Sequence, residues 1–328
     1  MSEYDRLERS ALQRRDAAYR PGSQKIIKAT FRSFLAYAIK FRLDLAKLTS
    51  GHILAYIELL INSGLSQATV ANKVSNLRCA FQNNNIPHKC LWHRDVTLIL
   101  KGSKSTIRQI NSNPGVFSVV QLERIIKACN YYKHPKLFKA VYTLAFHAFL
   151  RISNIAPVRF NRFDQSRHLC RGDVLWNKPE MHIILKWSKT LQSSNNHQTI
   201  PLLPMSNQLL CPVSHLLSYL NSTTGLPNDP LFAIIVRGRL ISISHLQIRT
   251  HLRKILLRIN VNSKKYGFHT FRRTGATLAE ASGVSYKSIQ DHGTWKSAAV
   301  DTYLRKQVVP PTVPLAFQAL LGKANNGN

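Results

Sequence analysis

The sequence predicts a mainly α-helical protein that has a small β-hairpin insert and is divided into two parts. Apolar residues recur at helical spacing through residues 23–81. A polar stretch at residues 101–115, KGSKSTIRQINSNPG, has no such period and is rich in Ser, Asn, Lys and Gly, as interdomain linkers are. Two short apolar runs around a turn, within residues 173–187, interrupt the second part. A chain of 328 residues is long enough for two domains.

Three amphipathic helices are expected in the first part. They span residues 23–41, residues 50–62 and a segment that begins after residue 66. Gly64 separates the second and third helices, as a glycine at a helix C-terminus does. The apolar stripes consist of Ile27, Phe31, Phe34 and Ala38; Ile53, Ile57 and Leu60; and Val70, Val74, Leu77 and Phe81.

Two basic residues of the third helix, Lys73 and Arg78, lie away from its apolar stripe. In that position they could contact phosphate groups. They could equally form the solvated face that any surface helix presents. The sequence leaves both interpretations open.

The second part is expected to be helical on both sides of the hairpin. Ser118 and Gln121 have the spacing of a capping box that begins a helix. The hairpin strands are DVLW, at residues 173–176, and MHIILKW, at residues 181–187, joined by the turn NKPE. Lys189 follows in a polar loop, where a lysine has the freedom to reach a reacting group.

Further helices are expected near residues 211–221 and 243–259. Another begins at His269 and ends at Ala281-Ser-Gly283, and a short one that begins near Ser297 carries Tyr303. The tail has an apolar patch formed by Leu315, Phe317, Leu320 and Leu321. The expected organisation is a polar segment (1–22), a helical domain (23–100), a linker (101–115), a second domain (116–309) and a tail (310–328).

The composition points to a nucleic-acid partner. The chain has 46 Lys and Arg against 15 Asp and Glu, a formal charge of +31, and a pI of about 10.5. A chain this basic repels itself, and a polyanion relieves the repulsion. DNA is the expected partner, because neutralising its phosphates releases counterions. A basic protein of the ribosome or of a membrane surface is the alternative.

The sequence gives no sign of secretion, of a membrane span or of a cofactor. No apolar run approaches the roughly 20 residues of a membrane span, and the N-terminus lacks a signal-peptide core. The five cysteines form no C-x-x-C pair, so reduced thiols and a cytosolic or nuclear location are expected. We expect no metal, no cofactor and no small-molecule substrate. The cysteines are Cys79, Cys90, Cys129, Cys170 and Cys211.

Six side chains form a set suited to attack by a tyrosine on a phosphodiester. Two guanidinium groups can hold the non-bridging oxygens of the phosphate through forked donors. A tyrosine is a weak nucleophile until a base takes its proton, and an imidazole can be that base. An amine can protonate the departing oxygen, and an indole can donate to the phosphate. The six are Arg151, Lys189, His269, Arg272, Trp295 and Tyr303.

The order of these six residues resembles the catalytic set of the tyrosine recombinases, the phage integrase family. The resemblance covers residues 116–305, and the helical segment before it more loosely. The phrases LRISN, WSKT and WKSAAVDTY are most similar in texture to the recombinases of eukaryotic cryptons and tyrosine-recombinase retrotransposons. The resemblance implies a helical core-binding domain and a catalytic domain that form a C-shaped clamp around duplex DNA.

The resemblance also implies a role for each residue. Tyr303 would attack the scissile phosphate and leave a 3′-phosphotyrosyl intermediate with a free 5′-hydroxyl. Arg151 and Arg272 would clamp the phosphate, while His269 acts as base and then as acid. Lys189 would protonate the leaving oxygen, and the Trp295 indole would donate to the phosphate. The expected assembly is a homotetramer on two DNA sites, serving integration or excision of a mobile element. A eukaryotic host would place the protein in the nucleus.

Two positions depart from the family pattern. Many members have histidine where Trp295 stands, and an indole can donate a hydrogen bond but cannot shuttle a proton. His292, three residues earlier, is the alternative for that position. Many members also have an acidic residue where this chain has Asn154, and a carboxylate would orient Arg151 more strongly. A second His-x-x-Arg match, which begins at His168, is rejected because no tyrosine follows at the right distance.

Two other functions stay open. A topoisomerase of the same chemistry would relax supercoils without exchanging partners. A domesticated, inactive DNA-binding protein would keep the clamp for regulation. The intact Tyr303 and both arginines argue against the inactive protein, since such residues are lost first when activity decays.

Overall fold

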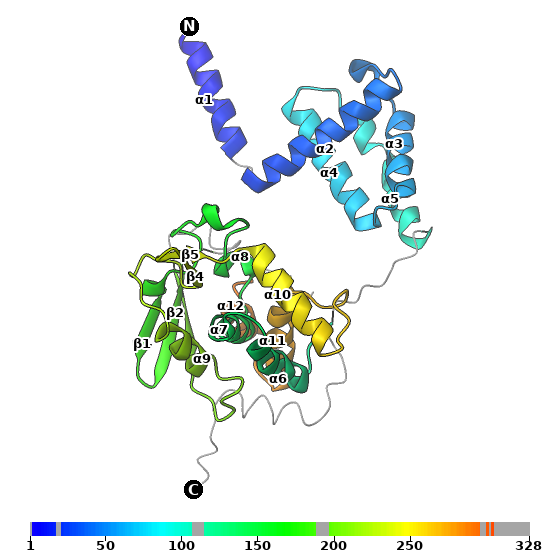
Figure 1. The fold of residues 1–328 in the computed structure, drawn as a ribbon. Helices are drawn as coiled ribbons and strands as arrows, with labels where there is room; N and C mark the ends of the chain where they lie inside the picture. The colour runs from blue at the N-terminus through cyan, green and yellow to red at the C-terminus, as the bar shows by residue number, and fades with distance from the viewer. Residues whose placement is uncertain are drawn as a thin grey trace. The chain divides into compact units, whose positions relative to one another are not determined.

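The computed structural model describes residues 2–17, 21–106, 115–187, 197–295, 300–301 and 303–304 (Figure 1). It consists of helices with small antiparallel sheets, so the predicted fold class is confirmed. The chain divides into two compact units, Met1–Ser112 and Asn113–Asn328. Within the described ranges, no helix has both the length and the apolar character that a bilayer span requires.

The first unit is helical. The three predicted helices are α2, α3 and α4, and each helix end that was predicted lies within about two residues of the observed one. The elements of this unit are α1 (Glu3–Ala17), α2 (Pro21–Lys40), η1 (Leu45–Lys47), α3 (Ser50–Asn62), α4 (Gln67–Asn83), η2 (Lys89–Trp92) and α5 (Arg94–Thr106).

The core of the first unit is an aromatic cluster between α2, α3 and α4. The Phe34 ring lies 5.1 Å from that of Tyr56 and 5.2 Å from that of Phe81, with edge-on geometry in both pairs. All three side chains are buried. Gly64 has a φ of +79°, which a glycine adopts without strain, and its N–H donates to the Ile61 carbonyl at the end of α3.

Two segments of the first unit differ from the sequence expectation. The polar start is helical as α1, because Ser2 and Asp5 form reciprocal side-chain to backbone hydrogen bonds that cap its N-terminus. Residues 101–106, expected in the linker, continue α5. Ser103 is buried and donates to the Leu100 carbonyl, so these polar residues are ordered by packing that local periodicity does not reveal. The rest of the expected linker, up to residue 114, lies outside the described residues.

Arg78 has a structural role in this unit. Its Nε and Nη2 donate to the Leu91 carbonyl at 3.2 and 2.9 Å, and its guanidinium lies 4.1 Å from the centre of the Trp92 ring. The side chain therefore connects α4 to η2. The sequence left open a phosphate contact or a solvated helix face for Arg78, and this contact within the unit is neither of the two.

The second unit contains helices and two small sheets. The capping box of Ser118 and Gln121 is present at the start of α6. The elements are α6 (Val119–Ala128), η3 (Cys129–Tyr131), α7 (Pro135–His147), α8 (Ile152–Ile155), η4 (Phe160–Arg162), η5 (Arg171–Asp173), β1 (Val174–Asn177), β2 (Glu180–Leu185), β3 (Gln198–Leu202), α9 (Pro212–Leu220), β4 (Ala233–Val236), β5 (Arg239–Ser242), α10 (His245–Arg258), α11 (His269–Ala281) and α12 (Tyr286–His292).

The predicted hairpin is extended by a third strand. The sheet has the order β1-β2-β3 with antiparallel pairs, and Ile183 pairs with Val174 on one side and Ile200 on the other. Alternate residues of β2 are buried, so one face of the sheet packs on the core. A second hairpin, β4-β5, was not predicted.

Helix α11 is the central element of this unit, with α7 beside it (Figure 1). Its residues from 270 to 279 are all buried, arginines included. Gly275 permits the approach of the two helices, since a β-carbon at this position would overlap the Phe146 carbonyl and the Phe149 ring. The close packing holds the first turn of α11, which begins at His269, against the end of α7, which leads to Arg151.

Candidate active site

Arg272 is buried in the middle of the candidate site. Only 2% of it is exposed, and its Nη1 and Nη2 donate to the carbonyls of Phe149 and Gly293. The guanidinium carbon lies 3.9 Å from the centre of the Trp295 ring and 5.4 Å from that of Tyr303. Burial, followed by the charge of Arg151, lowers the pKa of Arg272 to about 9. The guanidinium is therefore still a cation at neutral pH.

His269 contacts the Tyr303 hydroxyl. The distance from Nε2 to the phenol oxygen is 2.6 Å. The residue keeps an exposed edge, but desolvation of the imidazole by the groups around it lowers the pKa of His269 to about 4, and the charges of Arg272, Arg273 and Arg151 act in the same direction. The imidazole is thus neutral at neutral pH, and its Nε2 can accept the phenol hydrogen.

Arg151 lies at the N-terminus of α8 and is half-buried. Burial lowers its pKa, and attraction to the Tyr303 oxygen opposes that effect. The two arginines and the tyrosine hydroxyl therefore share one electrostatic environment, although they come from the residue before α8, from α11 and from the segment after α12.

Three donors of the site face no acceptor. Arg151 Nη1, Arg272 Nε and Trp295 Nε1 are buried and have no hydrogen-bond partner among the described residues. An unpaired buried donor costs about 1–3 kcal/mol, so each is expected to have a partner in the functional state. Three such donors, on side chains that surround Tyr303, fit an incoming oxyanion.

Trp295 lies beside the tyrosine, with its ring centre 5.0 Å from that of Tyr303. Thr294 before it has a φ of +57°, and a β-carbon on Gly293 would overlap the six-membered ring of the indole. The turn after α12 therefore directs the indole onto Arg272, and it needs a glycine to do so.

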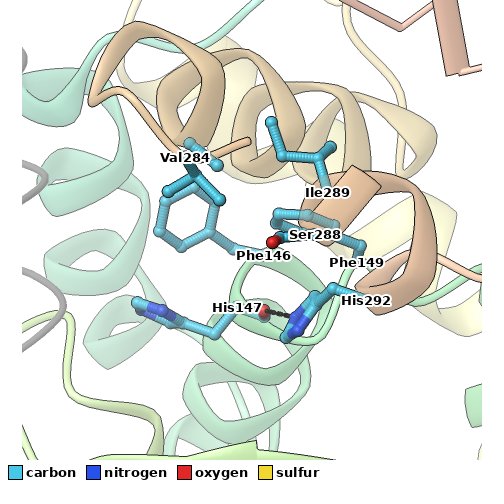
Figure 2. Close-up of a pocket in the computed structure, with 8 residues that line it drawn as sticks. Phe146, His147, Phe149, Val284, Ser288, Ile289 and His292 are labelled. Carbon is cyan, nitrogen blue, oxygen red and sulfur yellow. Dashed lines mark hydrogen bonds between the residues drawn. The ribbon is translucent and has the colours of Figure 1, made fainter. Parts of the chain in front are cut away.

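His292, the alternative for this position, points elsewhere. Its Nε2 lies 2.8 Å from the His147 carbonyl oxygen (Figure 2). It lines an apolar pocket of about 200 Å³ between α7, α11 and α12, together with Phe146, Phe149 and Ile289. Burial lowers its pKa. In this structure Trp295 is the neighbour of Tyr303, and His292 is not.

Lys189 lies outside the described residues. The other lysine nearby, Lys186, pairs with Asp173 at 2.8 Å, and its Nζ lies 3.4 Å from Cys170 Sγ. Burial lowers the pKa of Lys186, the Asp173 carboxylate raises it, and the net shift is upward. Lys186 is thus engaged in an ion pair at the hairpin.

Two residues that contact Tyr303 were not predicted from the sequence. The Arg273 guanidinium carbon lies 5.8 Å from the Tyr303 ring centre, and Thr277 Oγ1 donates to the Tyr303 carbonyl at 3.1 Å. A signal was available, because His269, Arg273 and Thr277 recur every four residues and so form one face of α11. The rejected His168 accepts from the Asp164 N–H at 3.0 Å, which is a local turn contact.

The fold and this site define a class, the tyrosine recombinases. The family model described as "Phage integrase family" matches residues 116–308, and the chain belongs to that family. A comparison with curated protein sequences finds no significant match.

Several solved structures share the fold. The Tn1549 transposon integrase, in complex with circular intermediate DNA, is 14% identical over 94% of this chain and 92% of that one, with a TM-score of 0.54. A lambda integrase dimer bound to a core site is 15% identical over 93% and 77%, with a TM-score of 0.58. The XerH site-specific recombinase bound to its difH substrate is 15% identical over 84% and 73%, with a TM-score of 0.54.

Proposed function

We propose that this protein is a site-specific DNA recombinase that cuts and rejoins DNA through a 3′-phosphotyrosyl intermediate at Tyr303. One observation carries the proposal: the Tyr303 hydroxyl lies 2.6 Å from Nε2 of His269, a histidine kept neutral by its surroundings. A neutral imidazole in hydrogen-bond contact with a phenol is a base in place for that phenol.

In the cleavage step, His269 accepts the phenol proton as the Tyr303 oxygen attacks phosphorus. A bond forms between that oxygen and phosphorus, and the bond from phosphorus to the 5′ oxygen breaks. Lys189 supplies the proton that the departing oxygen needs. The unpaired donors on Arg151, Arg272 and Trp295 bind the non-bridging oxygens, whose charge increases in the transition state. Six residues take part in this step: Arg151, Lys189, His269, Arg272, Trp295 and Tyr303.

In the rejoining step, the 5′-hydroxyl of a partner strand attacks the phosphotyrosine. His269 then returns its proton to the tyrosine oxygen, and Lys189 accepts the proton of the incoming hydroxyl. The same groups work in reverse, so the reaction conserves the energy of the phosphodiester. The proposal extends to a homotetramer on two DNA sites, in which such partner strands are adjacent.

Duplex DNA is the proposed partner. The formal charge of +31 supports it. The similar structures of the Tn1549 integrase, lambda integrase and XerH are complexes with DNA, which adds support at the level of the fold. The helical domain at residues 23–100 and the catalytic domain at residues 116–309 would form the clamp.

The proposed biological role is integration or excision of a mobile element. The similarity of the fold to a transposon integrase supports this role. The texture of LRISN and WSKT supports an affinity with eukaryotic cryptons and tyrosine-recombinase retrotransposons, and with it a nuclear location.

The test is covalent trapping. The protein is mixed with nicked suicide duplexes made from sequences that flank its own gene and from a random-sequence pool, and adducts are separated on denaturing gels. We expect an adduct with the wild type and none with Tyr303→Phe. Tyr286→Phe is the matched control, since Tyr286 is exposed and pairs with Asp301.

Each other outcome selects an alternative. An adduct that persists in Tyr303→Phe assigns the nucleophile to another tyrosine. Tight DNA binding without an adduct across the random pool supports the inactive regulatory protein. Relaxation of a supercoiled plasmid without strand exchange between two sites supports the topoisomerase.

A further inference from the structure

The main chain of Tyr303 is held by a side chain of α11. Thr277 Oγ1 donates to the Tyr303 carbonyl at 3.1 Å, and only 3% of Thr277 is exposed. A threonine inside a helix commonly returns its hydroxyl to the carbonyl four residues earlier. The Thr277 hydroxyl donates to another segment, 26 positions later in the chain. The contact therefore joins α11 to the segment that carries Tyr303.

The same helix also contacts the other end of this tyrosine. His269 Nε2 lies 2.6 Å from the phenol oxygen, and the Arg273 guanidinium carbon lies 5.8 Å from the centre of the ring. Thr277 follows His269 by roughly two turns of α11. Tyr303 is thus held along one face of the helix, with its phenol at His269 and its carbonyl at Thr277.

The other main-chain hydrogen bond of Tyr303 is local. Its N–H donates to the Val300 carbonyl at 2.7 Å, and Val300 is fully buried. This contact closes a turn within the segment itself, so the turn can shift as a whole without breaking it. Of these two hydrogen bonds, only the one from Thr277 ties the Tyr303 main chain to α11.

The position of the main chain decides where the phenol oxygen lies. The oxygen of a tyrosine lies on the axis of its ring, so rotation of the ring about that axis does not move the oxygen. The first side-chain torsion is confined to staggered wells. Within one such well, a displacement of the main chain is therefore passed on directly to the oxygen.

We propose that Thr277 is a positioning residue, whose hydroxyl fixes Tyr303 along α11 so that the phenol oxygen meets both His269 and the phosphorus. This inference rests on the proposed function, because it concerns the nucleophile of that reaction. A misplacement of about 1 Å in a reacting atom can slow a reaction about 10²-fold. Loss of the hydroxyl should therefore slow the attack. It should not weaken DNA binding, since a buried side chain offers no surface to DNA.

The test compares two substitutions at this position in the intact protein. Thr277→Val removes the hydroxyl and keeps the branched shape, whereas Thr277→Ser keeps the hydroxyl and removes the methyl group. The measurement is the single-turnover rate constant for adduct formation at saturating DNA. We expect Thr277→Val to be at least about tenfold slower than the wild type and Thr277→Ser to be within about threefold. The DNA affinity of both variants should stay within about twofold of the wild type.

Thr274→Val is the matched control. Thr274 lies one turn earlier on α11, is fully buried, and accepts from the Phe117 N–H at 3.0 Å. The control therefore loses a buried hydrogen bond of the same helix that does not involve Tyr303. We expect its rate constant to stay within about twofold of the wild type. Partial unfolding of any variant lowers the amplitude of adduct formation and leaves the rate constant of the folded molecules unchanged.

Three results would overturn the proposal. The first is an unchanged rate constant in Thr277→Val. The second is a rate constant in Thr277→Ser as low as that in Thr277→Val, or lower, which would assign the effect to packing of the methyl group. The third is an equal slowing in Thr274→Val, which would assign it to a general weakening of α11. Failure of the wild type to form an adduct would instead contradict the proposed function.

Discussion

Cleavage by this protein should hardly slow between pH 8 and pH 5.5. Desolvation of the imidazole, followed by the charges of Arg272, Arg273 and Arg151, lowers the pKa of His269 to about 4. At pH 5.5 a group with that pKa is about 97% neutral, whereas a histidine with the ordinary pKa of about 6.5 is about 9% neutral. The supply of neutral base therefore differs roughly tenfold between the two cases.

The assay is the rate constant for adduct formation at DNA concentrations far below saturation, because this quantity reports the ionisation of the free enzyme. Other histidines also titrate in this range and can change DNA binding. The rate constant at each pH is therefore corrected by the DNA affinity of Tyr303→Phe at the same pH. We expect the corrected rate to fall less than about 1.5-fold down to pH 5.5. A tenfold fall with a midpoint near pH 6.5 would refute the account of His269 as a base kept neutral by its surroundings.

The lowered pKa of His269 keeps the cleavage rate constant over this range, but it makes the stability of the fold depend on pH. The unfolded chain binds a proton on His269 near pH 6.5, and the folded chain binds it only near pH 4. Protonation therefore favours unfolding, and stability is lost as pH falls from about 6.5 to about 4. Thermal unfolding of the intact protein should show a declining Tm over a pH window in which the corrected cleavage rate is still flat.

Two substitutions test the arrangement around Arg272. Gly293→Ala should slow adduct formation at least about 100-fold, because a β-carbon there displaces Trp295, whereas Gly267→Ala meets no atom of the described residues within 4 Å and should leave the rate unchanged. Equal rates for both variants would show that the indole position does not matter. Arg272→Lys leaves at least one of its two carbonyl acceptors, such as that of Phe149, without its partner, at about 1–3 kcal/mol. This corresponds to a Tm lower by roughly 2–12 °C, with a rate loss of about 10²-fold or more. An unchanged Tm by differential scanning calorimetry would contradict the contacts described.

The sequence predicts the elements whose signals are local. Helix α3 and its end at Gly64 follow from an apolar stripe and one glycine, and both are present. The β4-β5 hairpin was not predicted because its turn, Arg237-Gly238, lacks the usual sequence signal. Both residues have positive φ, and such turns usually begin with Asn, Asp or Gly. With arginine at the first turn position, the sequence does not indicate a turn there.

The parts of the site that depend on tertiary contacts could not be predicted. Nothing in the sequence shows that Lys186 pairs with Asp173, because the partner lies on another segment of the hairpin region. The orientation of His292 toward the His147 carbonyl depends on how α12 packs against α7. From the sequence, Asn154 was expected to act as a weaker substitute for a carboxylate. In the structure its Nδ2 donates to the Trp187 carbonyl at 2.7 Å, and the sequence does not reveal this acceptor.

The central claim is that Tyr303 forms the covalent bond to DNA, and mapping the bond tests it most directly. The trapped adduct is digested with nuclease and trypsin, and the modified peptide is identified by mass spectrometry. Trypsin releases Tyr303 in the peptide SAAVDTYLR, in which it is the only tyrosine. We expect a nucleotide-phosphate mass on this peptide, located at Tyr303. The same mass on a peptide that carries another tyrosine, such as Tyr286, would contradict this claim.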